Sequence, residues 1–295
     1  MLKFIISESK LFSRLTQTPL LSHFFMLSAK SLTSVKDPKI FNEAIRKLRY
    51  GDVTGKETFN GRFIDLDNDA LNYLKGGMSV HDVGCSTGVT SLELYETCEK
   101  NNLKLRYHIS DKFTSLFFSG KFLTTVFDKD GKIRQIYFLN VLFDKHLSLA
   151  FFASKFLSIF FSRTIIMDVN KKNITKISLL DPKVQALEKE GKVTVLDYDV
   201  FEGNNEKYDF IRCMNVLNKS YFSDDQIKLG LENLFKSAKE NGYLLIGRTN
   251  KHYVNRASLY KKNSNSFTLI KTYNGGSEVD DLLLMLSKKK LAGPS

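Results

Sequence analysis

The sequence predicts a doubly wound α/β fold: a mostly parallel seven-stranded sheet with an antiparallel last strand, and a β-hairpin plus helix inserted after the second strand. Three observations predict it. Short apolar runs alternate with stretches of helical periodicity in both halves of the chain. The first run ends in a glycine-rich turn, Gly84 to Gly88, which is typical of the passage from strand to helix in these sheets. Between the halves, Asp130-Gly131 separates two apolar runs and indicates a hairpin.

Composition excludes several other classes. The chain has 295 residues, of which 42% are hydrophobic and 26% charged, as expected for a globular domain with a large insertion. The three cysteines form no C-x-x-C pair, which excludes zinc ribbons, thioredoxin-like redox sites and a disulfide scaffold. No apolar run reaches the roughly 18 residues of a membrane-spanning helix. We therefore expect a cytoplasmic protein with reduced thiols.

The first part of the chain supplies the opening strand–helix–strand unit. Gly76-Gly77 closes a helical region, because glycine accepts the left-handed backbone found after helices. The second strand ends at Ser110-Asp111. In order, we expect helical character over 39–75, a buried strand at 79–83, a helix at 90–100 and a strand at 103–109.

The middle of the chain interrupts this alternation. Apolar runs at 122–127 and 133–139 flank a polar Asp-Gly turn and predict a hairpin, and an apolar stretch at 146–161 predicts a helix. The distance from Asp111 to Asp199 is far longer than one crossover helix requires. Residues 115–178 are therefore expected to form an insertion.

The alternating pattern resumes after Pro182. We expect a helix at 183–190, a strand at 193–196, a strand at 208–213, a helix at 224–241 closed by Gly242, a strand at 243–246, and closing antiparallel strands at 266–273 and 279–286 around Gly275-Gly276. The predicted organisation is a basic helical N-terminal segment at 1–68, a main domain at 69–114 and 179–287, the insertion at 115–178, and a flexible tail at 288–295.

Positive charge is concentrated in two segments. The formal net charge is +12, and residues 1–36 contribute +4 while residues 112–176 contribute +7. The second segment also holds twelve of the 24 phenylalanines. Basic residues interleaved with phenylalanine suit peripheral contact with a membrane, and nucleic acid is a less favoured anionic partner. The alternatives are a solvated basic surface and phenylalanines that fill a core.

The N-terminal segment leaves a question of targeting open. Residues 1–36 are rich in Ser and Thr, and their composition overlaps with that of an organelle transit peptide. They lack the continuous apolar core of a secretory signal. An amphipathic helix lying on the protein or on a membrane is the simpler interpretation.

The chemistry is expected at the turn after the first strand. Asp82, Gly84 and Gly88 form a D-x-G-x-x-x-G pattern. A dinucleotide fingerprint would need glycines where Ser86 and Val89 stand, and a P-loop would need a lysine where Val89 stands. Both of those phosphate-binding loops are therefore excluded.

This pattern resembles the first motif of the Rossmann-like, class I S-adenosylmethionine-dependent methyltransferases. In that family an acid at the position of Asp111 grips the ribose hydroxyls, because one carboxylate can accept two hydrogen bonds from a diol. Asp199-Val200 matches the position that recognises adenine, with Asp197 as a competing acid, and Asn215 lies in the segment that matches the fourth motif. The resemblance implies S-adenosyl-L-methionine as cofactor and these binding residues: Asp82, Gly84, Cys85, Ser86, Thr87, Gly88, Asp111, Asp199, Val200 and Asn215.

The later segments are most similar to the chemotaxis-receptor methyltransferase branch, and the turn at 275–278 is similar to one in uncharacterised bacterial methyltransferases. No receptor-docking domain is evident in the sequence. The implied activity is in-line methyl transfer to an unidentified acceptor, for which a hydrophobic or membrane-associated molecule is one candidate. The alternative is a cofactor-binding protein without turnover that contacts nucleic acid or membrane through its basic segments.

No catalytic residue is assigned from the sequence. Arg212, Arg248, Asn218 and Tyr221 are candidates for facing the acceptor. Cys85 is interpreted as a small packing residue rather than a nucleophile. The five histidines have no metal-ligand spacing, so no metal is expected, and those in predicted strands, His81 and His108, are interpreted as core or edge residues.

Overall fold

The computed structural model describes residues 36–47, 58–119, 123–131, 133–138, 141–143 and 174–291. The chain divides into two compact units. One comprises Thr58–Thr114 and Lys183–Ser295 and carries a seven-stranded sheet. The other comprises Met1–Glu57 and Ser115–Pro182 and carries a five-stranded sheet. Among the described residues, no helix has the length and apolar character needed to cross a membrane.

The seven-stranded sheet is the framework of the first unit. Its spatial order is β8-β2-β1-β9-β10-β11-β12, and its strands are β1 (Ser79–Val83), β2 (Arg106–Asp111), β8 (Val193–Asp197), β9 (Tyr208–Met214), β10 (Ala238–Thr249), β11 (Asn255–Asn263) and β12 (Ser266–Tyr273). The first five in this order are parallel, and β11 is antiparallel to both β10 and β12. The predicted mostly parallel α/β sheet is confirmed.

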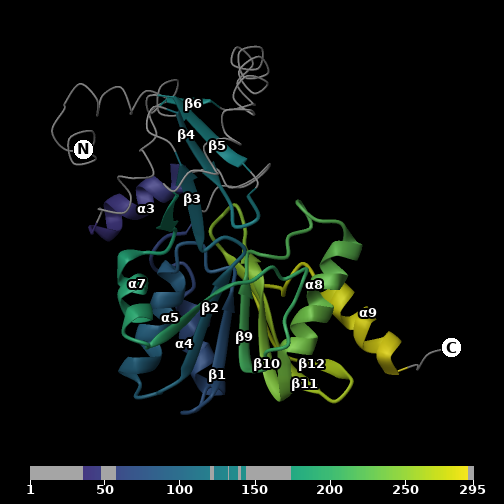
Figure 1. Cartoon of the computed structure of the whole chain (residues 1–295). Coiled ribbons are helices and arrows are strands. Elements are labelled where there is room, and N and C mark those ends of the chain that lie inside the picture. The colour runs from purple at the N-terminus through teal and green to yellow at the C-terminus, as the bar shows by residue number, and fades with distance from the viewer. Residues whose placement is uncertain are drawn as a thin grey trace. The chain divides into compact units, whose positions relative to one another are not determined.

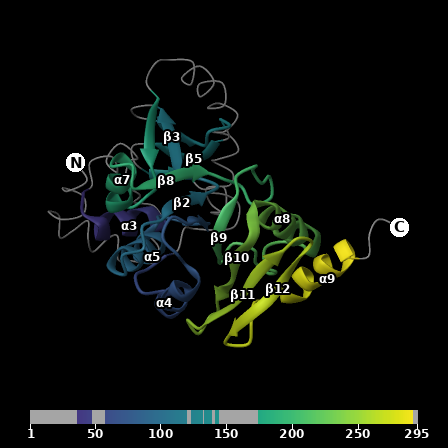
Figure 2. The ribbon, with the colours of Figure 1, turned by 90° about the horizontal axis from the view of Figure 1, so that it is seen from below.

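Helices cover both faces of this sheet (Figures 1 and 2). One face carries α4 (Ile64–Ala70), the short 3-10 helix η2 (Leu71–Tyr73), α5 (Val89–Lys100) and α7 (Pro182–Lys189). The other carries α8 (Asp224–Ser237) and α9 (Asp280–Leu291). β1 lies between β2 and β9 in this sheet, and all five of its residues are buried, as expected for a parallel strand covered on both faces.

The helix α8 shows how local sequence sets an element's limits. Ser223 caps its start in a reciprocal capping box with Gln226, and Ile227, Leu231 and Leu234 bury one face at helical spacing. The helix ends at Ser237, four residues earlier than predicted, because β10 begins at Ala238. Gly242 therefore lies inside an irregular part of β10 and does not close the helix.

The prediction of the closing strands was partly wrong. The antiparallel strands are β11 and β12, whereas the run at 279–286 belongs to α9. Two features favour helix there: Asp280 and Asp281 lie in its first turn, and Leu282, Leu283 and Leu286 recur at helical spacing. These leucines join the core cluster between α8 and the sheet.

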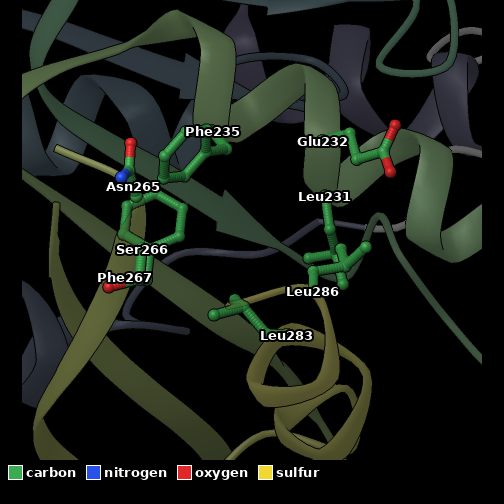
Figure 3. Close-up of a pocket in the computed structure, with 8 residues that line it drawn as sticks. All are labelled: Leu231, Glu232, Phe235, Asn265, Ser266, Phe267, Leu283 and Leu286. Atoms are coloured by element: carbon green, nitrogen blue, oxygen red, sulfur yellow. The ribbon is translucent and has the colours of Figure 1, made fainter. Parts of the chain in front are cut away.

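A shallow apolar hollow lies between α8, β12 and α9. Figure 3 shows its lining, which comprises Leu231, Glu232, Phe235, Asn265, Ser266, Phe267, Leu283 and Leu286. None of these residues belongs to the glycine turn or to the predicted cofactor residues, so the hollow is separate from the chemistry considered below.

The second unit contains an antiparallel sheet in the order β6-β5-β4-β3-β7, together with α3 (Pro38–Lys47). Its strands are β3 (Ser115–Ser119), β4 (Leu123–Phe127), β5 (Ile133–Phe138), β6 (Val141–Phe143) and β7 (Thr175–Ser178). The predicted hairpin is confirmed as β4–β5, and Gly131 adopts the positive φ of +76° expected in its turn. The sheet extends this hairpin by three strands that the sequence did not predict. The predicted helix at 146–161 and residues 1–35 lie outside the described residues.

Candidate functional site

The site is built at the carboxyl edge of the seven-stranded sheet, where the strand order reverses. From β1 the chain continues to β2 and β8 on one side, whereas β9 and β10 lie on the other side. Loops that leave two such neighbouring strands diverge, which creates a crevice at their carboxyl ends. Residues that contact a ligand are therefore expected in the segments that follow β1, β2, β8 and β9.

The turn after β1 is held in place by one carbonyl of β2. The backbone N–H groups of Gly84 and Cys85 both donate to the Ser110 carbonyl over 2.8 Å. Gly84 has a φ of +77°, and a Cβ there would lie 2.2 Å from Cγ2 of Val216. Only glycine fits both the backbone conformation and the space. The tight backbone turn predicted at Gly84 thus has a steric basis, whereas its predicted contact with a cofactor stays a prediction.

Gly88 begins α5 and brings it close to α7. Its φ of +82° is left-handed, and a Cβ would lie 3.0 Å from Cγ2 of Val184. The N–H of Gly88 donates to the Cys85 carbonyl over 2.8 Å, which closes the turn. Thr87 is fully buried and its hydroxyl oxygen has no hydrogen-bond partner. Cys85 is 3% exposed, in accord with its interpretation as a packing residue.

The acid at the end of β2 connects with this turn. Oδ2 of Asp111 accepts a hydrogen bond from the Ser86 N–H over 2.8 Å, and Oδ1 accepts one from the Phe113 N–H over 3.1 Å. Ser86 has a φ of +59°, a conformation that non-glycine residues rarely adopt. The structure therefore brings together Ser86 and Asp111, two of the predicted site residues.

The segment after β8 distinguishes the two candidate acids. Asp197 accepts two hydrogen bonds from Thr114, through its N–H and its hydroxyl, and so fixes the chain that leaves β2. Asp199, two residues further along the chain, forms an ion pair with Lys112, with 2.6 Å between Nζ and Oδ2. Lys112 was not predicted as a site residue. The available signal was a cation directly after the acid that ends β2.

Val200 and Asn215 have structural contacts at the same edge. Val200 is 4% exposed, and its carbonyl accepts a hydrogen bond from Asn233. Asn215, at a φ of +62°, donates its N–H to the Gly247 carbonyl and accepts the Thr249 N–H at Oδ1, both over 2.8 Å. Asn215 thus joins the ends of β9 and β10.

Asp82 requires a correction. Its carboxylate is buried beneath the turn, where it accepts hydrogen bonds from Nε and Nη2 of Arg212 and from the Ser91 hydroxyl. Both carboxylate oxygens are thus used inside the core, and direct contact with a cofactor is not supported. Arg212 is 1% exposed and also binds Asp67, so it cannot face an acceptor as predicted.

The buried cluster of Asp67, Asp82 and Arg212 contains one more acid than base. Burial raises the pKa of Asp67 to about 6, although the Arg212 guanidinium acts in the opposite direction. The cluster joins α4 to β1 and β9 under the glycine turn. Asp67 was not predicted because its sequence pattern is that of an ordinary acid in a helix.

His81 is a core residue and His108 is half-buried, in accord with their interpretation as core or edge residues. His81 is fully buried, with 2.8 Å between its Nε2 and the Ser110 hydroxyl oxygen, and its ring lies 4.3 Å from that of Tyr208. Burial lowers the pKa of His81 to about 3 and also lowers the pKa of His108. A histidine that stays neutral and enclosed is unsuited to proton exchange with a substrate.

Of the other side chains predicted to face an acceptor, Arg248 and Asn218 are hydrogen-bonded to each other, whereas Tyr221 is exposed. Arg248 forms an ion pair with Glu278 over 2.8 Å and donates to the side chain of Asn218. Tyr221 is 54% exposed. Within the described part of the chain, no group of three or more His, Cys, Asp or Glu residues is placed to hold a metal ion.

Comparisons with known proteins give only distant likenesses. No family model matches the chain, and no curated protein matches it. The N-methyltransferase NodS from Bradyrhizobium japonicum, solved with S-adenosyl-L-homocysteine, is 12% identical with a TM-score of 0.33; the match covers 64% of this chain and 62% of NodS. A S-adenosylmethionine-dependent methyltransferase from Clostridium acetobutylicum is 10% identical with a TM-score of 0.37, over 79% of this chain and 81% of that one.

A third solved structure is a putative protein-L-isoaspartate O-methyltransferase from Plasmodium falciparum, in complex with S-adenosyl-L-homocysteine. It is 12% identical with a TM-score of 0.36, and the match covers 84% of this chain and 95% of that protein. With TM-scores below 0.5, these likenesses carry no conclusion about this chain.

Proposed function

We propose that this chain binds S-adenosylmethionine at the carboxyl edge of the seven-stranded sheet and transfers its methyl group to an acceptor. The observation that carries the proposal is the hydrogen bond from Ser86 to Asp111, which joins the glycine turn after β1 to the acid that ends β2. The turn and the acid meet at the point where the strand order reverses, which is where open α/β sheets bind their ligands.

The residues at this edge suit an adenosyl group. Asp111 supplies two carboxylate oxygens, the acceptors that a ribose diol requires, and Asp199 supplies an acceptor for the amino group of adenine. Gly84 and Gly88 give the turn its left-handed backbone, and valine side chains occupy the space beside their Cα atoms. In this assignment Asp111 exchanges its hydrogen bond with Ser86 for one with the ligand.

When bound, the cofactor supplies an already activated methyl group. The contribution of the chain is then mainly alignment, which accounts for about 7–11 kcal/mol of barrier lowering in well-oriented reactions. Asn215 fixes the ends of β9 and β10 beside the turn through its contacts with Gly247 and Thr249. A base is needed only for an acceptor that must lose a proton, and no residue is assigned to that role.

Isothermal titration with S-adenosylhomocysteine tests the proposal. We expect the parent chain to bind and Asp111→Asn to bind at least about tenfold more weakly, because an amide accepts at one oxygen only. The matched control is Asp225→Asn, which removes a 92% exposed carboxylate on α8. Absence of binding to a folded parent chain would remove the proposal.

We also propose a hydrophobic or membrane-associated acceptor, with peripheral membrane contact through residues 115–178 and the N-terminal segment. The support is the local net charge of +4 over residues 1–36 and of +7 over residues 112–176, which also hold twelve phenylalanines. Phe118 and Phe127 are buried, so some of these rings fill the second sheet. Sedimentation of the full chain with anionic and zwitterionic vesicles tests the idea. If the same fraction of the chain is found in the pellet with and without vesicles, the proposal is contradicted.

The alternative of a binding protein without turnover predicts a different outcome. A chain that binds RNA or DNA with affinity falling steeply as salt rises, and that transfers no methyl group to lipid, acid or RNA pools, would support this alternative. The concentration of positive charge in two segments is the observation that favours it.

A further inference from the structure

The ion pair between Lys112 and Asp199 occupies an acid of the proposed adenosyl site. Oδ2 of Asp199 lies 2.6 Å from Nζ of Lys112, and Oδ1 accepts a hydrogen bond from the Phe201 N–H over 3.0 Å. Both carboxylate oxygens therefore have partners within the chain. The two residues come from the segments that directly follow β2 and β8, so the ion pair spans neighbouring strand ends.

The two partners differ in how firmly they are placed. The Asp199 side chain is 12% exposed and is fixed by the turn that contains Phe201 and Gly203, whose N–H also donates to the Asp199 carbonyl. The Lys112 side chain is 57% exposed, and its ammonium lies 6.0 Å from the centre of the Phe113 ring. Lys112 can therefore withdraw into solvent while Asp199 stays in place.

We propose that Lys112 sets the affinity of this site for its adenosyl ligand by competing for Asp199. A ligand amino group that donates to Oδ2 of Asp199 has to displace the ammonium of Lys112. The inference rests on the proposed function, and it adds a residue that neither the glycine turn nor the strand-end acids imply. The expected effect has an unusual sign for a residue of a binding site, because substitution of Lys112 strengthens ligand binding and does not weaken it.

The size of the effect follows from the exposure of the ion pair. Ion pairs with one exposed partner are weak, so their loss changes an equilibrium only a few fold. We expect Lys112→Met to lower the dissociation constant for S-adenosylhomocysteine by about two- to fivefold. S-adenosylhomocysteine lacks the sulfonium charge, so this probe limits direct repulsion between the lysine and the ligand.

The experiment compares two lysines of the same kind by isothermal titration. Lys192→Met is the matched control, since Lys192 is 54% exposed and forms a 2.7 Å ion pair with Glu190 just before β8, at the opposite end of that strand. We expect no change in affinity for the control. A Lys112→Met variant that binds as tightly as the parent, or more weakly, overturns the inference.

A double-mutant cycle identifies the carboxylate through which Lys112 acts. In an Asp199→Asn background the ammonium loses its anionic partner, so Lys112→Met is expected to leave the affinity unchanged. A gain that persists in this background would show that Lys112 acts elsewhere and would overturn the inference. If the parent binds and only the Lys112 effect is missing, the proposed function stands. If neither the parent nor the variants bind, the proposed function fails and this inference fails with it.

Discussion

Ser86 donates its backbone N–H to Oδ2 of Asp111 over 2.8 Å, and this bond fixes a turn whose backbone is otherwise held by the carbonyl of Ser110. The two residues are 25 positions apart: Ser86 lies in the turn after β1, and Asp111 ends the neighbouring parallel strand β2. A carboxylate that accepts from a backbone N–H forms a stronger bond than a neutral acceptor does. Asp111 thus positions the turn, and in the proposed function it also accepts hydrogen bonds from the ligand.

The first prediction separates these two roles without any ligand. Asp111→Leu removes the acceptor of the Ser86 N–H, whereas Asp111→Asn keeps one amide oxygen that can accept it. We expect amide hydrogen exchange of residues 84–88 to accelerate about tenfold or more in the leucine variant, in line with the loss of about 1.5–3 kcal/mol from a bond to a charged group. The asparagine variant should stay within about threefold of the parent. Equal exchange in all three chains would contradict the positioning role.

The second prediction concerns Gly84 and Val216. Gly84→Ala places a Cβ 2.2 Å from Cγ2 of Val216 at a φ of +77°. We expect a loss of about 2–4 kcal/mol in unfolding free energy, measured by urea denaturation, because left-handed strain and overpacking add. Gly191→Ala is the control: its φ is +69°, but no atom lies within 4 Å of the added Cβ, so only the strain of about 1–2 kcal/mol remains.

The same pair offers a rescue. Val216→Ala removes the methyl group that an alanine at position 84 would strike. In a double-mutant cycle we expect the two substitutions to couple favourably by at least about 1 kcal/mol. If the losses of unfolding free energy in the two single variants simply add in the double variant, the backbone of the turn moves to accommodate the alanine. Val216 would then not determine the shape of the turn.

The sequence was sufficient to locate this turn but not to assign every acid near it. Gly84, Gly88 and Asp111 could be found because a buried strand, a left-handed turn and a second strand end follow from local patterns. Asp82 has the same local pattern, but its partner Arg212 is 130 positions away. A carboxylate at a strand end can face the crevice, or it can face an arginine inside the core. Tertiary packing decides between these two orientations, and a single sequence does not show that packing.

The closing strands illustrate a second limit. The leucine-rich run at 282–286 is apolar at every position, so strand and helix patterns both fit it. The decisive contacts are long-range: Asp280 accepts hydrogen bonds from Ser258 and Tyr260 of β11, which place the start of α9 against the sheet. The hairpin at Gly131, in contrast, was predictable because its turn chemistry is local.

The third prediction is an inverted pH dependence at Asp67. Burial raises the pKa of Asp67 to about 6 in the folded chain, from 3.8 otherwise. The folded state therefore prefers the protonated acid, and the stability linked to Asp67 is lost as the pH rises from about 4 to 6. We expect Asp67→Asn to gain stability relative to the parent by roughly 1 kcal/mol per pH unit across this range. Urea unfolding at several pH values measures the difference.

A neighbouring acid on the same helix provides the control. Burial acts to raise the pKa of Asp69, but hydrogen bonds from Lys271 and Tyr273 outweigh it and lower the value. For a lowered pKa, stability is present at neutral pH and is lost as the pH falls, so Asp69→Asn should lose stability at neutral pH. If Asp67→Asn and Asp69→Asn change the free energy of unfolding at neutral pH in the same direction, the raised pKa assigned to Asp67 in the buried cluster is contradicted.

The fourth prediction concerns His81, whose ring lies between those of Tyr198 and Tyr208 at centroid distances of 5.1 and 4.3 Å. Burial lowers its pKa to about 3, whereas the unfolded chain takes up the proton near 6.5. The contribution of neutral His81 to the free energy of unfolding is therefore fully present above about pH 6.5. It falls by roughly 1.4 kcal/mol per pH unit as the pH decreases toward 3. His81→Phe keeps an aromatic ring but leaves the Ser110 hydroxyl without this partner, at a cost of about 1–3 kcal/mol at pH 7.

Because phenylalanine does not titrate, the gap between this variant and the parent should narrow from pH 7 to pH 5. His252→Gln, which changes an exposed histidine, is the control substitution. Urea unfolding of the three chains gives the comparison, with Asp67→Asn introduced in each so that the opposite titration of Asp67 does not mask the slope. If the difference in unfolding free energy between His81→Phe and the parent stays constant with pH, His81 accepts a proton as readily in the folded chain as in the unfolded chain. That result would contradict a neutral, enclosed His81 that contacts the Ser110 hydroxyl.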